Sequence, residues 1–192
     1  GPFFSKKIKL FAETEYIRAA NGGTGEAKAA GNYAAAILPT EKAKAKGYDQ
    51  VLWLDANEHR YIQEVGTMNI FFKVDGNFIT PSTDGSILKG ITRDSVITLL
   101  KDKGFKVTER PITIDEIIQF SKEGRLEEAF GTGTAVAIAM VESIGYKDEE
   151  IVLPANNPVS VDVKQTLDQI KTQEQEDKFG WIIPVAIEEK VG

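Results

Sequence analysis

Residues 64–80 have the sequence EVGTMNIFFKVDGNFIT, and this stretch says most about the fold. Two β-rich runs, Asn69–Val74 and Asn77–Thr80, lie on either side of Asp75-Gly76. That dipeptide is typical of the two-residue type I′ turn, whose backbone twist matches the twist of paired strands. The stretch therefore predicts a β-hairpin near the middle of the chain.

Outside this hairpin, helical and strand-like patterns alternate. Thr92–Lys103 has amphipathic spacing and is followed by Gly104, a typical helix terminator. Thr113 and Glu116 form a capping box for a helix that runs to about Lys122. This mixture of hairpins and helices predicts an α+β or mixed α/β fold rather than a regular βαβ series. The other expected helices are Ala34–Ala45 and Ser160–Asp177, and the other expected strands are Ile8–Ala19, Val51–Asp55, Ala129–Val141 and Trp181–Ala186.

Composition excludes several classes of function. The 192 residues are 42% hydrophobic and 27% charged, with a net charge of −6, so nucleic acid and anionic membranes would repel the chain. There is no cysteine and one histidine, His59, which excludes disulfides and thiolate chemistry and argues against a histidine-cluster metal site. No apolar run is long enough for a transmembrane helix. We therefore expect an intracellular protein, cytoplasmic or in an organelle matrix.

Three segments rich in glycine and threonine are candidate anion sites. They are Gly22–Gly31, Gly90–Arg93 and Gly131–Thr134. Each places bare backbone beside the end of a helix or strand, where N–H groups can bind a phosphate without net positive charge. Gly90–Arg93 is the best single case, because it opens a helix whose first N–H groups have no partner. Taken one at a time, short motifs of this kind are more often ordinary tight turns.

Two charged residues stand in unusual settings. Lys28 lies among small residues in the first glycine-rich segment, and Glu64 directly precedes the hairpin region. By base rates both are surface residues. A lysine that faces a cavity could instead lose its proton through desolvation and form a Schiff base. A buried Glu64 could pair with a cationic ring.

The order of these segments resembles that of the branched-chain amino acid aminotransferases, which are fold-type IV, class IV enzymes dependent on pyridoxal 5'-phosphate. The match runs from Gly1-Pro2-Phe3-Phe4 to about Trp181. The family's segments appear here in its order and spacing, which makes the resemblance highly specific. They are Gly22–Lys28 followed by Gly31–Ala34, then Gln50–Asp55, Glu64–Phe72, Gly90–Arg93 and Glu128–Ala135.

The resemblance implies a D-amino-acid-aminotransferase-like fold with a large pseudobarrel domain and flanking helices. It also implies roles for particular residues. Lys28 would carry pyridoxal 5'-phosphate covalently and move the proton at the substrate Cα. Tyr33 would hydrogen-bond the phenolic oxygen of the cofactor, and Glu64 would keep its ring nitrogen protonated. The backbone of Ile91 and Thr92 and the Thr134 hydroxyl would hold the phosphate. Thr67 and the Ala135 N–H would lie near the phosphate or the substrate carboxylate.

The sequence departs from the family pattern at two positions. Ala30 stands where the family usually has the first of two glycines, and Lys89 stands where it usually has proline. Neither change removes a functional group. Ala30 would be strained if its φ were positive.

A larger departure concerns domains. We interpret residues 1–192 as the large C-terminal domain alone, without the small N-terminal domain that supplies an arginine to the phosphate and part of the substrate pocket. The parent enzyme would transfer amino groups between leucine, isoleucine or valine and 2-oxoglutarate as a homodimer, and this chain alone would be inactive or weak. Alternatives are a D-amino-acid aminotransferase, an aminodeoxychorismate-lyase-like enzyme of the same fold, or a folded fragment without catalysis.

Overall fold

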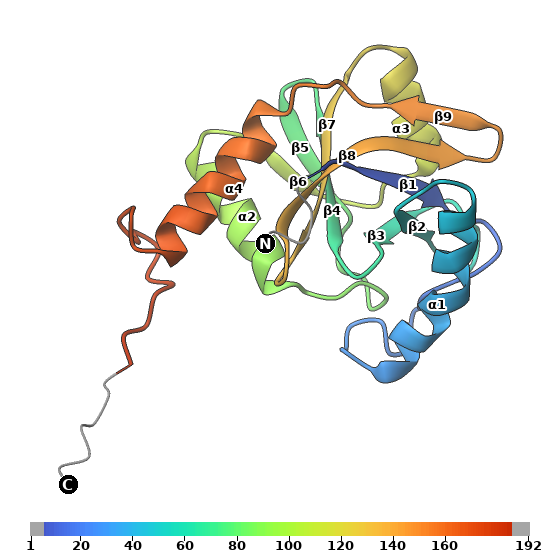
Figure 1. The fold of residues 1–192 in the computed structure, drawn as a ribbon, viewed down its shortest axis with the longest axis horizontal. Coiled ribbons are helices and arrows are strands. Elements are labelled where there is room, and N and C mark those ends of the chain that lie inside the picture. Colours follow the sequence, from blue (N-terminus) through green and yellow to red (C-terminus); the bar gives the residue numbers. More distant parts are fainter. Residues whose placement is uncertain (1–5, 186–192) are drawn as a thin grey trace, which may run out of the picture.

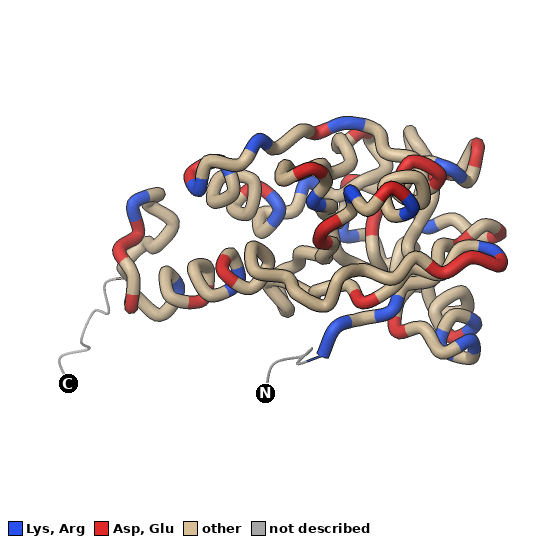
Figure 2. The backbone as a smooth tube through the Cα atoms, turned by 90° about the horizontal axis from the view of Figure 1, so that it is seen from above, with Lys and Arg blue, Asp and Glu red and all other residues tan. Residues whose placement is uncertain are grey.

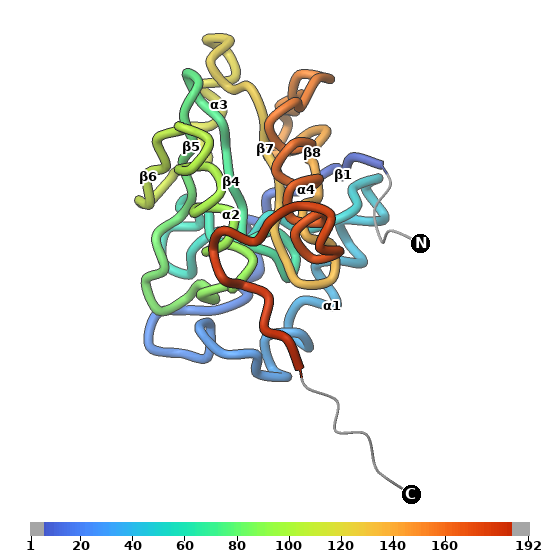
Figure 3. Tube along the Cα trace, turned by 90° about the vertical axis from the view of Figure 1, so that its left-hand side faces the viewer, coloured from blue at the N-terminus to red at the C-terminus, as the bar shows by residue number. Residues whose placement is uncertain are grey.

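A computed structural model describes residues 6–185 (Figure 1). Its centre is one mixed sheet in the order β3-β2-β1-β8-β7-β4-β5-β6, with β9 paired to β8. The sheet curls, and α2 (Ile91–Asp102) and α4 (Pro158–Lys171) cover one side of it while α1 (Ala30–Ala45) lies beside β2. Figures 1 and 3 show α3 (Ile114–Lys122) and α1 toward opposite ends of the strands. The strands are β1 Ile8–Ala12, β2 Gln50–Leu54, β3 Ile62–Val65, β4 Asn69–Val74, β5 Asn77–Thr80, β6 Val107–Glu109, β7 Leu126–Gly133, β8 Ala137–Tyr146 and β9 Glu149–Val152.

The hairpin expected from residues 64–80 is confirmed. β4 pairs antiparallel with β5, and Val74 lies opposite Asn77 across a two-residue turn. Asp75 has a φ of 49° and Gly76 a φ of 75°, as a type I′ turn requires. β4 also pairs along its length with β7, which places the hairpin inside the sheet. The predicted mixed α+β pseudobarrel fold is thus confirmed.

The helices are α1 Ala30–Ala45, α2 Ile91–Asp102, α3 Ile114–Lys122 and α4 Pro158–Lys171. The Thr113 side chain accepts a hydrogen bond from the Glu116 N–H at 3.1 Å, so half of the predicted capping box forms. The Glu116 carboxylate pairs with Arg110 instead of returning to the cap. Gly104 follows α2 with a φ of 86°, a left-handed conformation that glycine adopts without steric cost.

The sheet has two apolar faces because successive side chains in a strand point to opposite sides. In β4, Ile70 and Phe72 face a core cluster that α3 closes. Phe71, between them, faces a second cluster shared with α2 and α4. There it stacks on Phe130 of β7 at a ring-centroid distance of 5.3 Å. Both faces of the central strands are therefore buried.

Two expected strands differ from the sequence-based prediction. The strand expected over Ile8–Ala19 ends at Ala12, because the Glu13 carboxylate accepts two following backbone N–H groups and turns the chain. The single strand expected over Ala129–Val141 is wrong: β7 and β8 are an antiparallel pair joined through residues 134–136. Ala137 has a φ of 56° at this turn, which a run of small apolar residues does not signal.

The C-terminal region also differs from expectation. α4 ends at Lys171, and Gln173 follows with a φ of 60°, so the helix does not reach Asp177. The strand expected over Trp181–Ala186 is wrong for residues 181–185, and Ala186 lies outside the described residues. Trp181 instead stacks on Phe179 at 4.5 Å and packs against the second core cluster. Trp181 is thus held by side-chain packing and not by strand pairing.

Charge is dispersed over the surface. Figure 2 shows Lys and Arg interleaved with Asp and Glu along most of the chain. No helix among residues 6–185 has both the length and the apolar character needed to cross a bilayer.

Candidate functional site

The loop that carries Lys28 is fixed by buried contacts, although the Lys28 side chain is exposed. Asn32, in the first turn of α1, is 7% exposed. Its Nδ2 donates to the Thr24 carbonyl at 2.8 Å, and its Oδ1 accepts from the Thr24 hydroxyl at 2.7 Å. Gly25 approaches Ser86 so closely that a Cβ would lie 2.3 Å from the Ser86 carbonyl oxygen. The glycine-rich segment is thus an anchored loop, and burial does not desolvate Lys28.

Glu64 is a buried carboxylate surrounded by donors. It is 3% exposed in β3, and its Oε2 lies 3.1 Å from Arg18 Nε. Its Oε1 accepts from the Leu88 N–H at 2.8 Å and lies 3.4 Å from Asn69 Nδ2. Burial raises the pKa of the Glu64 carboxyl, and the Arg18 charge opposes it most strongly. The Leu88 N–H and the nearby Lys28 charge also act to lower this pKa.

Arg18 is the residue that sequence reasoning missed. Its side chain is 8% exposed, and its Nη2 donates to the carbonyls of Ser86 at 2.5 Å and Gly25 at 3.4 Å. One guanidinium therefore ties the Lys28 loop to the segment before α2 and to Glu64. The signal available in the sequence was an arginine ten residues before the lysine, with no motif around it.

The N-terminus of α2 offers free backbone donors. Gly90 is the N-cap and contributes no side-chain hydrogen bond, so the first N–H groups of the helix, at Ile91 and Thr92, have no intrahelical acceptor. Ile91, Thr92 and Thr134 line a cavity of about 390 Å³. Lys171, at the end of α4, lines the same cavity and adds a positive charge, and Asp94, in the first turn of α2, lines it too and adds a negative one. This arrangement is suited to an anion such as a phosphate.

Asn69 links the Glu64 region to the α2 N-terminus. Its Nδ2 donates to the Leu88 carbonyl at 2.8 Å, and a Cβ on Gly90 would lie 2.3 Å from Asn69 Oδ1. Asn69 also pairs in register with Thr132, two residues before Thr134. Glu64 and the N-terminus of α2 are therefore both next to Asn69.

Six of the predicted residues border two cavities, three residues in each. Tyr33, Glu64 and Thr67 border a small cavity of about 20 Å³, together with Arg18 and Leu88. Ile91, Thr92 and Thr134 border the larger one. Lys28 and Ala135 line neither cavity: Lys28 is exposed in its loop, and Ala135 is exposed in the β7–β8 turn beside Thr134.

The two departures from the family pattern are accommodated. Ala30 begins α1 and is not among the residues with positive φ, so the strain considered from the sequence does not arise. Lys89 has a side chain 68% exposed and pairs with Glu26 at 3.3 Å. It lies on the surface between the loop and α2.

Replacing Asn32 with alanine should loosen the Lys28 loop. The variant loses the hydrogen bonds to Thr24. Losing this buried polar contact is expected to lower the stability of the loop by about 1–3 kcal/mol. The Ala27 amide, which donates to the Thr24 carbonyl at 3.0 Å, should then exchange with deuterium roughly tenfold faster. Thr40→Ala, which removes one hydroxyl contact later in α1, is the control. Unchanged Ala27 exchange in the Asn32 variant would contradict this account of the loop.

A family model described as amino-transferase class IV matches residues 4–144. Among curated proteins, the chain is similar to branched-chain-amino-acid aminotransferase 2 of Bacillus subtilis, 50% identical over 94% of this chain and 50% of that protein. It is likewise similar to a probable branched-chain-amino-acid aminotransferase of Staphylococcus aureus, with 49% identity over 94% of this chain and 51% of that protein. The chain spans about half the length of the curated relatives it matches.

Solved structures give the same picture. The branched-chain amino acid aminotransferase of Escherichia coli has a TM-score of 0.77 and 33% identity, covering 91% of this chain and 56% of its own. An aminotransferase from Brucella abortus bound to the cofactor pyridoxal phosphate has a TM-score of 0.73 and 25% identity, covering 88% and 56%. A putative 4-amino-4-deoxychorismate lyase from Legionella pneumophila, at 24% identity and a TM-score of 0.73 over 86% and 57%, shares the fold.

Proposed function

The chain belongs to the class IV aminotransferase family, and from this premise we propose that it is the cofactor-binding part of a branched-chain amino acid aminotransferase. The reaction would move an amino group between leucine, isoleucine or valine and 2-oxoglutarate. The curated relatives named above support this choice of amino acid. The observation that carries the proposal is the buried Glu64–Arg18 pair beside the open N-terminus of α2.

The cofactor of this family is pyridoxal 5'-phosphate, and the residues present fit it. The phosphate needs donors, and the uncapped backbone of Ile91 and Thr92 faces one cavity together with the Thr134 side chain. The ring nitrogen needs an anion. Burial raises the pKa of the Glu64 carboxyl, and the Arg18 charge acts against this shift to favour the ionised form. A carboxylate has about four acceptor positions, so Glu64 can accept another hydrogen bond beside the ones it already has.

Pyridoxal phosphate, when bound, supplies an electron sink for negative charge at the substrate Cα. The chain's own residues would do the remaining work. Lys28 would attach the cofactor and later move the proton at the substrate Cα. Glu64 would hold the ring proton, and Tyr33 would donate to the phenolic oxygen. Thr67 and the Ala135 N–H would lie near the phosphate or the substrate carboxylate.

The rest of the enzyme is part of the proposal. We propose that a small N-terminal domain completes the substrate pocket and adds an arginine at the phosphate, and that the complete enzyme is a homodimer in the cytoplasm or an organelle matrix. A charge-assisted hydrogen bond contributes roughly 1.5–3 kcal/mol, or about one to two orders of magnitude in cofactor affinity. The 192-residue chain alone should therefore turn over slowly or not at all.

Adding pyridoxal phosphate to the purified chain tests the proposal. We expect the visible absorption of lysine-linked cofactor to appear with saturation and to disappear in the Lys28→Ala variant. Leucine and 2-oxoglutarate should then give turnover far below that of a complete enzyme under the same conditions. A chain that is folded but never develops this absorption would be a fragment without cofactor chemistry. Turnover equal to that of the complete enzyme would show that the described residues suffice.

A further inference from the structure

A turn at the start of the Lys28 loop has no part in the site described above. The Gly23 N–H donates to the Ala20 carbonyl at 3.0 Å, which makes Asn21 and Gly22 the central residues of a β-turn. Gly22 has a φ of 81°, as the third position of a type II turn requires. A Cβ on Gly22 would meet no atom within 4 Å, and both central residues are exposed. The turn is therefore open to solvent.

Asn21 places a side-chain amide directly beside the backbone nitrogen of a glycine. It is the only asparagine in the sequence that glycine follows. The Gly22 N–H donates to no acceptor within residues 6–185, and glycine has no side chain to obstruct an approach to its nitrogen. The Gly22 nitrogen can therefore reach the Asn21 amide carbon once its N–H loses the proton.

We propose that Asn21 is a site of spontaneous deamidation. The Gly22 nitrogen bonds to Asn21 Cγ, the bond from Cγ to Nδ2 breaks, and ammonia leaves with the proton of the Gly22 N–H. The product is a cyclic succinimide, which water opens at either carbonyl group to give aspartate or isoaspartate. The sum of these steps is asparagine plus water to aspartate or isoaspartate plus ammonia. It needs no oxidant or reductant.

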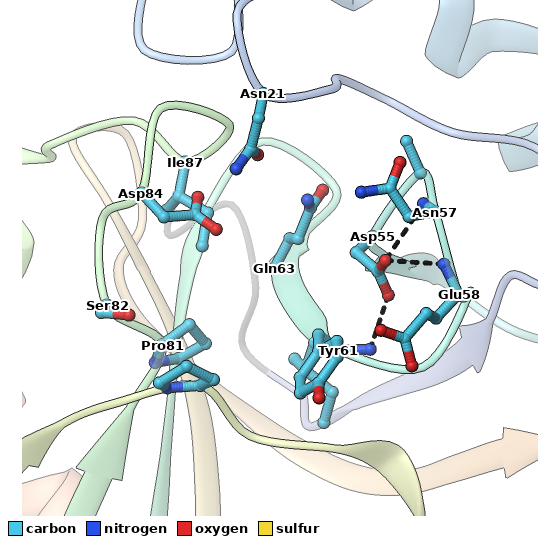
Figure 4. A pocket seen from close by; sticks show the side chains of 13 residues that line it. Asn21, Asp55, Asn57, Glu58, Tyr61, Gln63, Pro81, Ser82, Asp84 and Ile87 are labelled. Atoms are coloured by element: carbon cyan, nitrogen blue, oxygen red, sulfur yellow. Dashed lines mark hydrogen bonds between the residues drawn. The ribbon is translucent and has the colours of Figure 1, made fainter.

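The new carboxylate would lie at an acidic cavity. Asn21 lines a cavity of about 300 Å³, and Figure 4 shows its side chain pointing into that space. The carboxylates of Asp55, Glu58 and Asp84 line the same cavity, and no lysine or arginine among residues 6–185 does. Because nearby like charges disfavour one another, a carboxylate at position 21 destabilises the turn in its present orientation.

Isoaspartate also lengthens the main chain, which then runs through the Cβ of residue 21. Ala19 and Gly25, on either side of the turn, are both buried, so the extra atom must be absorbed between them. The hydrogen bond from Gly23 to Ala20 is the contact that closes this stretch. Deamidation is therefore expected to open the turn.

Asn57 provides a matched internal control. It is exposed and lines the same cavity, but the residue after it has a side chain, and the Glu58 N–H donates to Asp55 Oδ2 at 2.8 Å. The purified chain is incubated at mildly acidic and mildly alkaline pH, and peptide mapping by mass spectrometry follows both asparagines. We expect conversion at Asn21 to be at least about tenfold faster than at Asn57, which corresponds to a barrier lower by about 1.4 kcal/mol. The rate at Asn21 should rise with pH, because the attacking nitrogen must lose its proton, and the product should include isoaspartate.

Two variants and one exchange measurement complete the test. Asn21→Gln keeps an amide but would need a larger ring, so its peptide should remain unmodified, whereas Asn57→Gln should leave conversion at Asn21 unchanged. In the converted chain, purified by anion exchange, the Gly23 amide should exchange with deuterium at least about tenfold faster than in the parent. Equal rates at Asn21 and Asn57, aspartate without isoaspartate, or unchanged Gly23 exchange in the converted chain would overturn the proposal. None of these measurements involves the cofactor, so they are independent of the proposed function.

Discussion

Replacing Lys28 with alanine is expected to abolish covalent attachment of pyridoxal phosphate while leaving the fold intact. Lys28 is exposed in a loop that Asn32 anchors, so removing its side chain leaves no cavity in the core. The amine is the only group in that position that can bond to the aldehyde carbon of the cofactor, and no neighbouring hydroxyl substitutes for it. Borohydride reduction of the cofactor-treated chain, followed by peptide mapping, should label the peptide that contains Lys28 and no other.

Lys89 provides the matched control. It is also exposed, and it lies at the entrance to α2, paired with Glu26. Lys89→Ala should therefore retain labelling at Lys28, with at most a small change in affinity from the loss of an exposed ion pair. Labelling of Lys89 or of any other lysine in the parent chain would show that the assignment of Lys28 is wrong.

Much of the fold could be predicted because local and global signals agree. The Asp75-Gly76 turn, the helix over residues 91–102 and the Thr113 cap each follow from a backbone requirement that a short sequence satisfies. The failures arose where tertiary contacts decide. The division of Ala129–Val141 depends on strand pairing, and Trp181 is held by packing on Phe179 and the helices rather than by its own propensity.

The candidate site divides in the same way. Residues marked by glycine-rich segments, such as Lys28 and Thr92, could be chosen from the sequence. Arg18 and Asn32 could not, because their importance lies in what they reach: Arg18 joins segments far apart in the chain, and Asn32 contacts a loop eight residues before it. Lys171 lines the same cavity as Thr92 and Thr134 only because α4 packs beside α2. Such residues become visible only when the packing is known.

The Glu64→Gln substitution should reveal the burial of the carboxylate through the pH dependence of stability. The folded-state pKa of Glu64 is raised above its ordinary value of 4.5, so the folded state binds this proton more tightly than the unfolded state does. The resulting stabilisation is fully present below pH 4.5 and is lost as the pH rises through the raised pKa. The free energy of unfolding of the parent minus that of the variant should therefore fall as the pH rises above 4.5. Urea titrations across this range measure the difference, and a difference that increases with pH would contradict it.

In the complete enzyme, the same substitution should slow transamination more than it weakens the fold. A glutamine fills the volume of Glu64 and can still accept from the Leu88 N–H, but it cannot stabilise a protonated ring nitrogen. It also leaves the buried Arg18 charge without its partner. Losing a charge-assisted hydrogen bond of roughly 1.5–3 kcal/mol in the transition state corresponds to about a 10- to 100-fold fall in kcat. Glu127→Gln, which disturbs only the contact with Lys73 and the Gly76 N–H, should leave kcat unchanged. A parent-like rate in the Glu64 variant would exclude Glu64 as the partner of the ring nitrogen, because an amide cannot do what an ionised carboxylate does for a pyridinium proton.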